Sequence, residues 1–295
     1  MKERKHTLFD GVCTALATPF RDGSIDWDAL SEMIDTQIDG GVSAICICGT
    51  TGEAATLTDG ERLRLVARAG ELIDGRADYI VGVGSPSTSR SVSYARHAAA
   101  NGADALLAVT PYYNKGTRDG ITTHFKTLAD VTELPVILYN VPARTGVNLT
   151  VSHIEEIARH PNIKGLKEAG DSLDKLVDFM AALGGRVKLY AGNDSHFVPS
   201  LALGGSGVIS VVSGILPAEM TDIWRLWQQG RHAEAMRQQL TFLPLIRLLF
   251  EDTNPAPLKY ALSMMGLCTG ELRLPLSPVS PALAEKIRRQ LGLGN

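Results

Sequence analysis

One lysine of this chain stands at the end of a short apolar run, where charged side chains are rare. The run Asn162–Leu166 reads as a buried strand, and Lys167 follows it directly. An unpaired charge is costly in such a place, so burial favours the neutral amine. A neutral amine can attack a ketone and form a Schiff base. The structural alternative is a lysine that extends to the rim or forms an ion pair with Glu168.

Two further apolar runs are followed by residues that carry hydroxyl groups. The segment Gly49–Glu53 holds Thr50 and Thr51 between glycines, and its backbone N–H groups and hydroxyls can hold a small carboxylate. The alternative is an ordinary turn in which a threonine caps a helix. Tyr112 and Tyr113 follow another apolar run. They are either a packing corner beside a proline or phenols that relay protons.

A further run ends in Tyr139 and continues into a loop with an arginine. Tyr139 offers an acid–base group, and Arg144 offers a clamp for a carboxylate. The alternative is a core tyrosine and a surface arginine. Together, a lysine, three tyrosines, two threonines and an arginine at strand ends can bind a keto acid, form an imine and move protons. This set predicts a carbonyl-handling lyase or synthase.

Other motifs give no sign of a metal or nucleotide cofactor. His153 and Glu156 have helical spacing, but no further ligand accompanies them, so we expect them to be solvated. The segments 192–195 and 204–207, of which the second is glycine-rich, match no nucleotide-binding fingerprint. A net charge of −3 over 295 residues predicts no nucleic-acid surface. We expect neither a signal peptide nor a membrane span, which would need roughly 18–20 apolar residues.

The elements that position these residues follow from alternation between apolar runs and helical patterns. This alternation predicts a parallel sheet, and eight units favour closure into a (β/α)₈ TIM barrel, with the active site at the carboxyl ends of the strands. The predicted strands are Gly11–Ala17, Ala44–Cys48, Tyr79–Val83, Ala105–Thr110, Pro135–Asn140, Ile163–Lys167, Val187–Ala191 and Gly207–Ser210. The predicted helices between them are Trp27–Gly40, Asp59–Asp74, Ser89–Asn101, His124–Val131, Val151–Ala158 and Leu173–Leu183.

The chain continues well beyond the eighth predicted strand. More helical stretches follow than one barrel helix can use, namely Ala218–Gln229, Ala233–Phe250, Pro257–Met265 and Pro281–Leu291. We expect residues 1–215 to form the barrel. Residues 216–295 are expected to form its last helix and a C-terminal helical extension, for which a position at a subunit contact would be suitable.

Several segments stand in the order and spacing of one known family. They are Gly49–Glu53, Pro111–Asn114, Tyr139–Gly146, Gly165–Ala169 and Gly207–Val211, and the likeness continues through Asn254–Lys259 and Leu272–Pro275. On these residues the chain resembles the dihydrodipicolinate synthase family, also called 4-hydroxy-tetrahydrodipicolinate synthase, of the pyruvate-dependent aldolase superfamily. The lysine and tyrosine segments mark the superfamily. The double threonine and the arginine are more specific to the synthase.

The resemblance implies a reaction and the groups that perform it. Pyruvate and L-aspartate 4-semialdehyde would condense to 4-hydroxy-tetrahydrodipicolinate, in lysine and diaminopimelate biosynthesis. Lys167 would form the Schiff base with pyruvate, and Tyr139 would relay protons. Thr51 would link Tyr139 to Tyr113, and Tyr113 would reach in from a neighbouring subunit.

The resemblance also implies how the substrates are held. Thr50, Thr51 and their backbone N–H groups would hold the pyruvate carboxylate. Arg144 would bind the carboxylate of aspartate semialdehyde, and Gly192 and the backbone of Ile209 would line the pocket near the lysine. No metal or organic cofactor is required. The expected assembly is a homotetramer, built as a dimer of dimers, in the cytoplasm.

Two other functions fit part of this pattern. One is a related aldolase that acts on a sugar-derived 2-keto acid. Arg144 and the threonine pair argue against it, because a neutral sugar aldehyde lacks the carboxylate that the arginine would bind. The other is a silent relative that only binds a small metabolite. Such a protein would have lost the lysine or the tyrosine, and both are present.

The chain departs from the family where many bacterial relatives bind lysine as a feedback inhibitor. The matching positions of that cleft, at the tight-dimer interface, are Ala54, Asp59, Arg62, Pro86 and Arg90, and only Tyr112 is as the family has it. Arg90 replaces an acidic residue that would pair with the ammonium group of the ligand, so it should repel lysine. We expect lysine to inhibit weakly or not at all.

Overall fold

The computed structural model describes residues 7–183 and 185–292, and eight of the strands in these residues close into one parallel barrel. The strands are β1 (Gly11–Ala15), β4 (Ala44–Ile47), β5 (Asp78–Gly82), β6 (Ala105–Val109), β7 (Val136–Asn140), β8 (Ile163–Glu168), β9 (Lys188–Ala191) and β10 (Gly207–Ser210). Every predicted strand is confirmed to within two residues at each end. This agreement follows because strands buried on both faces are continuous apolar runs. The (β/α)₈ barrel expected from the sequence is therefore confirmed.

Helices separate the barrel strands, as the alternating pattern predicts. They are α1 (Trp27–Asp39), α2 (Asp59–Ile73), α3 (Thr88–Ala100), α4 (Arg118–Asp130), α6 (Val151–Ile157), α7 (Leu173–Leu183) and the short α8 (Phe197–Ala202). The expected start of α4 at His124 is wrong. This helix begins at Arg118, because the side chain of Thr117 caps it by accepting a hydrogen bond from the Gly120 N–H.

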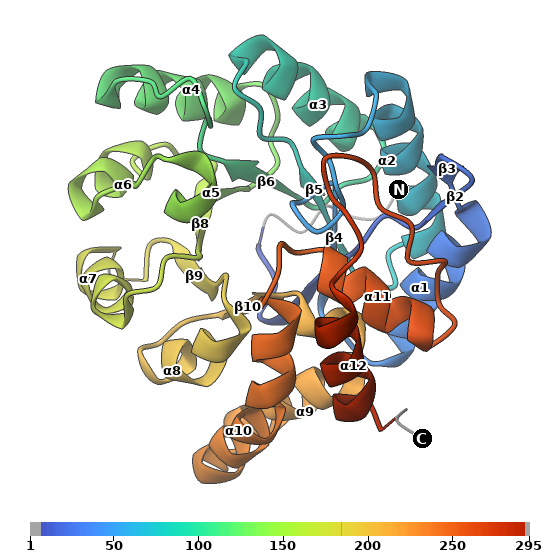
Figure 1. Ribbon diagram of the computed structural model, residues 1–295. Helices are drawn as coiled ribbons and strands as arrows, with labels where there is room; N and C mark the ends of the chain where they lie inside the picture. The colour runs from blue at the N-terminus through green and yellow to red at the C-terminus, as the bar shows by residue number, and fades with distance from the viewer. Residues whose placement is uncertain (1–6, 184, 293–295) are drawn as a thin grey trace. The chain divides into compact units, whose positions relative to one another are not determined.

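Contacts between residues divide the chain into two units, of which the first comprises residues 7–11 and 78–209 of the described chain. In this unit α3, α4, α6 and α7 pack each against the next (Figure 1). Strands β7 and β8 pair Tyr139 with Lys167 and Asn140 with Glu168. Successive side chains point to opposite faces of a strand. Tyr139 and Lys167 therefore share one face, and Asn140 and Glu168 share the other.

The second unit comprises residues 12–77 and 210–292 of the described chain. It contains β1, β4, α1 and α2, together with a short hairpin of β2 (Phe20–Arg21) and β3 (Ser24–Ile25). Its C-terminal helices are α9 (Pro217–Gln228), α10 (His232–Leu249), α11 (Ala256–Met264) and α12 (Pro281–Gln290). Helix α10 packs against α9 and α12, and α11 packs against α12 (Figure 1). The helical extension is thus confirmed, and its predicted boundary at residue 216 stays a prediction.

Within the described residues, no helix combines the length and the apolar character that a membrane crossing requires.

Candidate active site

The predicted nucleophile lies beside the predicted proton-transfer group. Lys167 is on β8 and Tyr139 is on β7, opposite each other in the strand register. The Nζ atom of Lys167 is 4.4 Å from the centre of the Tyr139 ring, and each side chain is 6% exposed. A carbon bonded to this amine would therefore lie next to the phenol. The structure thus brings together the two residues for which the sequence predicts imine chemistry.

The carboxylate of Glu168, the residue after Lys167, forms its hydrogen bonds and ion pair with other residues. Glu168 accepts hydrogen bonds from the side-chain amide of Asn140 at 2.8 Å and from the Gly170 N–H at 2.7 Å. Its Oε2 atom is 3.6 Å from Nζ of Lys175. Burial disfavours the charged form of both groups, so it raises the pKa of Glu168 and lowers the pKa of Lys175. The negative charge of Glu168 opposes the lowering of the Lys175 pKa. Glu168 thus pairs with Lys175 on the opposite face of β8 from Lys167.

The loop that carries Arg144 is fixed by hydrogen bonds at both of its ends. Asn140, at the end of β7, accepts from the Leu149 N–H at 3.0 Å. The Thr145 hydroxyl donates to the Val141 carbonyl at 3.1 Å, within the short helix α5 (Pro142–Thr145). Arg144 itself is exposed. A rigid loop with an exposed guanidinium is suited to bind a carboxylate in two hydrogen bonds.

Tyr113 lies exposed on the surface of the chain. Its side chain is 94% exposed, and its backbone has the left-handed φ of 63°. Bulky residues rarely adopt this conformation, and such strain is typical of functional loops. Two turn contacts maintain it, from the Asn114 N–H to the Tyr112 carbonyl and from the Lys115 N–H to the Tyr113 carbonyl. The phenol of Tyr113 therefore lies in solvent.

Gly192 and Ile209 are the remaining predicted site residues of the first unit. The Gly192 N–H donates to the Glu168 carbonyl at 2.7 Å, beside the end of β8. A Cβ atom on Gly192 would lie 2.6 Å from the Cβ of Ala169, so only glycine fits here. Ile209 is fully buried on β10. Their role as pocket lining stays a prediction.

In the second unit, Thr50 and Thr51 lie in a loop whose flanking residues are strained. Cys48 and Glu53 have left-handed φ values of 58° and 51°. The Thr18 hydroxyl donates to the Gly52 carbonyl at 2.7 Å. Thr50 is half-buried, whereas Thr51 is 2% exposed. The loop therefore has a fixed backbone and presents two hydroxyls of different exposure.

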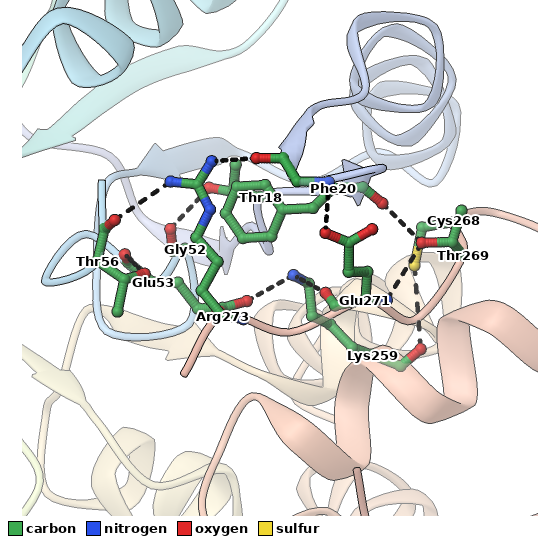
Figure 2. Close-up of polar contacts among 11 residues, drawn as sticks. Thr18, Phe20, Gly52, Glu53, Thr56, Lys259, Cys268, Thr269, Glu271 and Arg273 are labelled. Atoms are coloured by element: carbon green, nitrogen blue, oxygen red, sulfur yellow. Dashed lines mark hydrogen bonds and ion pairs between the residues drawn. The ribbon is translucent and has the colours of Figure 1, made fainter. Parts of the chain in front are cut away.

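Residues far along the chain hold this loop, and the sequence pattern does not single them out as site residues. The amide Nδ2 of Asn254 donates to Thr51 Oγ1 at 3.0 Å. Lys259 pairs with Glu53, with 2.5 Å between Nζ and Oε1 and both side chains fully buried (Figure 2). Lys259 stands among apolar residues in α11, which is the only local signal that it is buried.

The family follows from comparison with known proteins. The model of the dihydrodipicolinate synthetase family matches residues 8–292. This chain belongs to the dihydrodipicolinate synthetase family. Of its relatives in this family, the 4-hydroxy-tetrahydrodipicolinate synthase of Pelobacter propionicus is 42% identical over 275 residues, which are 93% of this chain and 95% of the relative.

Solved structures of the dihydrodipicolinate synthetase family have the same fold. The synthase of Methylacidiphilum fumariolicum is 38% identical, with a TM-score of 0.95, over 97% of this chain and 96% of that one. The chloride-inhibited dihydrodipicolinate synthase of Acinetobacter baumannii, solved in complex with pyruvate, is 36% identical, with a TM-score of 0.94, over 97% of this chain and 98% of that one. The relatives are thus similar over nearly their full length.

Proposed function

We propose that this chain is a 4-hydroxy-tetrahydrodipicolinate synthase, which condenses pyruvate with L-aspartate 4-semialdehyde. The observation that carries the proposal is the buried amine of Lys167 next to the Tyr139 phenol. The names of the relatives and the pyruvate complex of the Acinetobacter baumannii protein support it.

The proposed reaction begins at the Lys167 amine. Its lone pair attacks the ketone carbon of pyruvate, and loss of water gives an imine. The imine acidifies the pyruvate methyl group, which loses a proton and becomes an enamine. The enamine carbon attacks the aldehyde carbon and forms the new C–C bond. The amine of the semialdehyde then attacks the imine carbon, which closes the ring and returns Lys167 as a free amine.

Protons in these steps are moved by phenols and a hydroxyl in the proposed site. Tyr139 donates to the leaving oxygen and accepts again when the enamine forms. Thr51 links Tyr139 to Tyr113, as the resemblance implies. Tyr113 belongs to a neighbouring subunit in this proposal, and its 94% exposure supports that arrangement. The proposed assembly is a homotetramer, built as a dimer of dimers.

The two carboxylates of the substrates have separate proposed partners. Thr50, Thr51 and their backbone N–H groups hold that of pyruvate. Arg144 holds that of aspartate semialdehyde in a bidentate pair, which selects this aldehyde over a neutral sugar aldehyde. Gly192 and Ile209 line the pocket near the lysine. These steps need neither a metal nor an organic cofactor, and we place them in cytoplasmic lysine and diaminopimelate biosynthesis.

A coupled assay tests the proposed function. The protein is mixed with pyruvate, aspartate semialdehyde and an excess of dihydrodipicolinate reductase, and NADPH oxidation is followed. The expected signal requires both substrates and is absent in Lys167→Ala. No signal with aspartate semialdehyde, together with cleavage of a sugar-derived 2-keto acid, would contradict the proposal and assign the chain to the related aldolases.

A further inference from the structure

The buried hydroxyl of Thr51 is held by a residue that lies 203 positions further along the chain. Asn254 Nδ2 donates to Thr51 Oγ1 at 3.0 Å, and the two residues are 5% and 2% exposed. A threonine hydroxyl has one proton and two lone pairs, whereas the amide NH₂ group only donates. Because Asn254 occupies one lone pair, the proton of Thr51 is left to donate in another direction.

The loop around Thr51 is anchored by a second contact with the same C-terminal part of the chain. The strained residue Glu53 pairs with Lys259, and the backbone N–H of Arg273 donates to its other oxygen at 3.1 Å (Figure 2). Lys259 also donates to the Glu271 carbonyl at 2.7 Å and lies 4.1 Å from the centre of the Phe20 ring. The Glu53 end of the loop therefore cannot shift without breaking a buried ion pair, which fixes the place of Thr51.

We propose that Asn254 is a positioning residue of the pyruvate site, which acts through Thr51 by directing the hydroxyl proton of Thr51 toward its partner. This inference rests on the proposed function, in which Thr51 contacts pyruvate or the phenols. The backbone of the loop sets where the Thr51 oxygen lies, and Asn254 sets which way its proton points. Without the amide donor the hydroxyl can rotate to other acceptors.

Two substitutions of similar size separate this role from a structural one. Asn254→Asp replaces the amide donor by a carboxylate that only accepts. The Thr51 hydroxyl must then donate its proton to residue 254 and no longer donates it toward the substrate. Asn254→Leu removes the donor without offering an acceptor. We expect Asn254→Asp to lower kcat/KM for pyruvate by about tenfold, the contribution of about one hydrogen bond. The loss in Asn254→Leu should be smaller.

The decisive test is a double-mutant cycle with Thr51→Val. If Asn254 acts through Thr51, the double variant Thr51→Val/Asn254→Asp should be within about twofold of Thr51→Val alone, because coupled residues are not additive. Losses that multiply would overturn the proposal, as would an Asn254→Asp enzyme with unchanged kcat/KM. Asn162→Asp is the matched control. Its amide donates to the Ala129 and Thr132 carbonyls, so its effects should multiply with those of Thr51→Val.

A second readout separates failure of this inference from failure of the proposed function. Borohydride reduction with pyruvate alone measures imine formation and needs no aldehyde. We expect trapping to slow in Asn254→Asp and in Thr51→Val to a similar extent, with melting temperatures that show both variants folded. Trapping in Asn254→Asp at the wild-type rate would overturn only the role of Asn254 and leave the proposed function in place. A wild-type protein that traps no pyruvate would overturn the proposed function and this inference together.

Discussion

Lys167 Nζ lies 4.4 Å from the centre of the Tyr139 ring, and each of the two side chains is only 6% exposed. Tyr139→Phe removes the phenol oxygen and keeps the ring that packs against the amine. We predict an unchanged melting temperature and a kcat lower by about 10²–10⁴-fold, the usual contribution of a proton-transfer group. Steady-state kinetics with both substrates measure this. An unchanged kcat would remove Tyr139 from the chemistry.

The exposed Tyr113 predicts complementation between subunits. In the proposed assembly, Tyr113 of one subunit serves Lys167 of another. Tyr113→Phe and Lys167→Ala should each be nearly inactive, whereas refolding the two variants together should restore activity, because a mixed pair combines one intact lysine with one intact tyrosine. The control is each variant refolded alone. Mixtures that stay as inactive as their parents would show that Tyr113 does not act across the interface.

The buried pair of Glu53 and Lys259 predicts a large loss of stability when one partner is removed. Lys259→Met leaves the Glu53 carboxylate buried without a cation, and we expect the free energy of unfolding to fall by about 3–5 kcal/mol. Adding Glu53→Gln to this variant should recover part of the loss. Urea denaturation measures both. Lys286→Met, which breaks an exposed pair with Glu251, is the control and should cost less than about 1 kcal/mol. Strictly additive losses at Glu53 and Lys259 would contradict the coupling.

The ion pair of Glu61 and Arg273 predicts a pH dependence of stability. Oε1 of Glu61 is 2.5 Å from Nη2 of Arg273. The hydrogen bond from Arg273, helped by those from Thr58 and opposed by burial, lowers the pKa of Glu61 from 4.5 to about 2. Because the pKa of the folded state is the lower one, the contribution is complete above about pH 4.5 and is lost as the pH falls toward 2.

We therefore predict that Glu61→Gln lowers the free energy of unfolding at pH 7 by on the order of 1–2 kcal/mol, after allowance for solvent screening. The difference from the wild type should shrink as the pH is lowered from 4.5 toward 2. Urea titrations at three pH values in this range check the trend. A difference that stays constant down to pH 2 would show that the Glu61 charge does not provide it.

The cation at Arg90 predicts that free lysine inhibits weakly or not at all. Arg90 lies exposed on α3. The resemblance implies an acidic residue at this position, which would pair with the ammonium group of the inhibitor. Arg90→Glu should increase sensitivity to lysine, and Arg96→Glu on the same helix, with the same change of charge, should not. Half-maximal inhibition of the wild type at sub-millimolar lysine would contradict this prediction.

The sequence predicts the barrel well because its signal is local. Each buried strand is a continuous apolar run, and Lys167 can be found because a cation at the end of such a run is unusual. The short elements are missed because they give no such local signal. The hairpin of β2 and β3 and the helices α5 and α8 are too short to show a period, so no pattern separates them from loops.

The support of the site could not be read from the sequence. Lys259 lies 206 positions from Glu53, and Asn254 lies 203 positions from Thr51, so only the fold brings them together. A lysine within a helix is ordinarily read as a surface residue, yet Lys259 is fully buried. The residues for which we propose a role in the chemistry follow strands and can be recognised in the sequence. Asn254 and Lys259 belong to a segment that shares the spacing of the family, but the sequence does not show that they contact Thr51 and Glu53.

Covalent trapping of pyruvate on the protein tests directly whether Lys167 is the nucleophile. The wild type is incubated with pyruvate and borohydride, digested, and its peptides are mapped by mass spectrometry. We predict one reduced pyruvate adduct, on the peptide that contains Lys167, and none in Lys167→Ala. An adduct on a different lysine, or trapping that survives in Lys167→Ala, would contradict the assignment of Lys167 as the nucleophile.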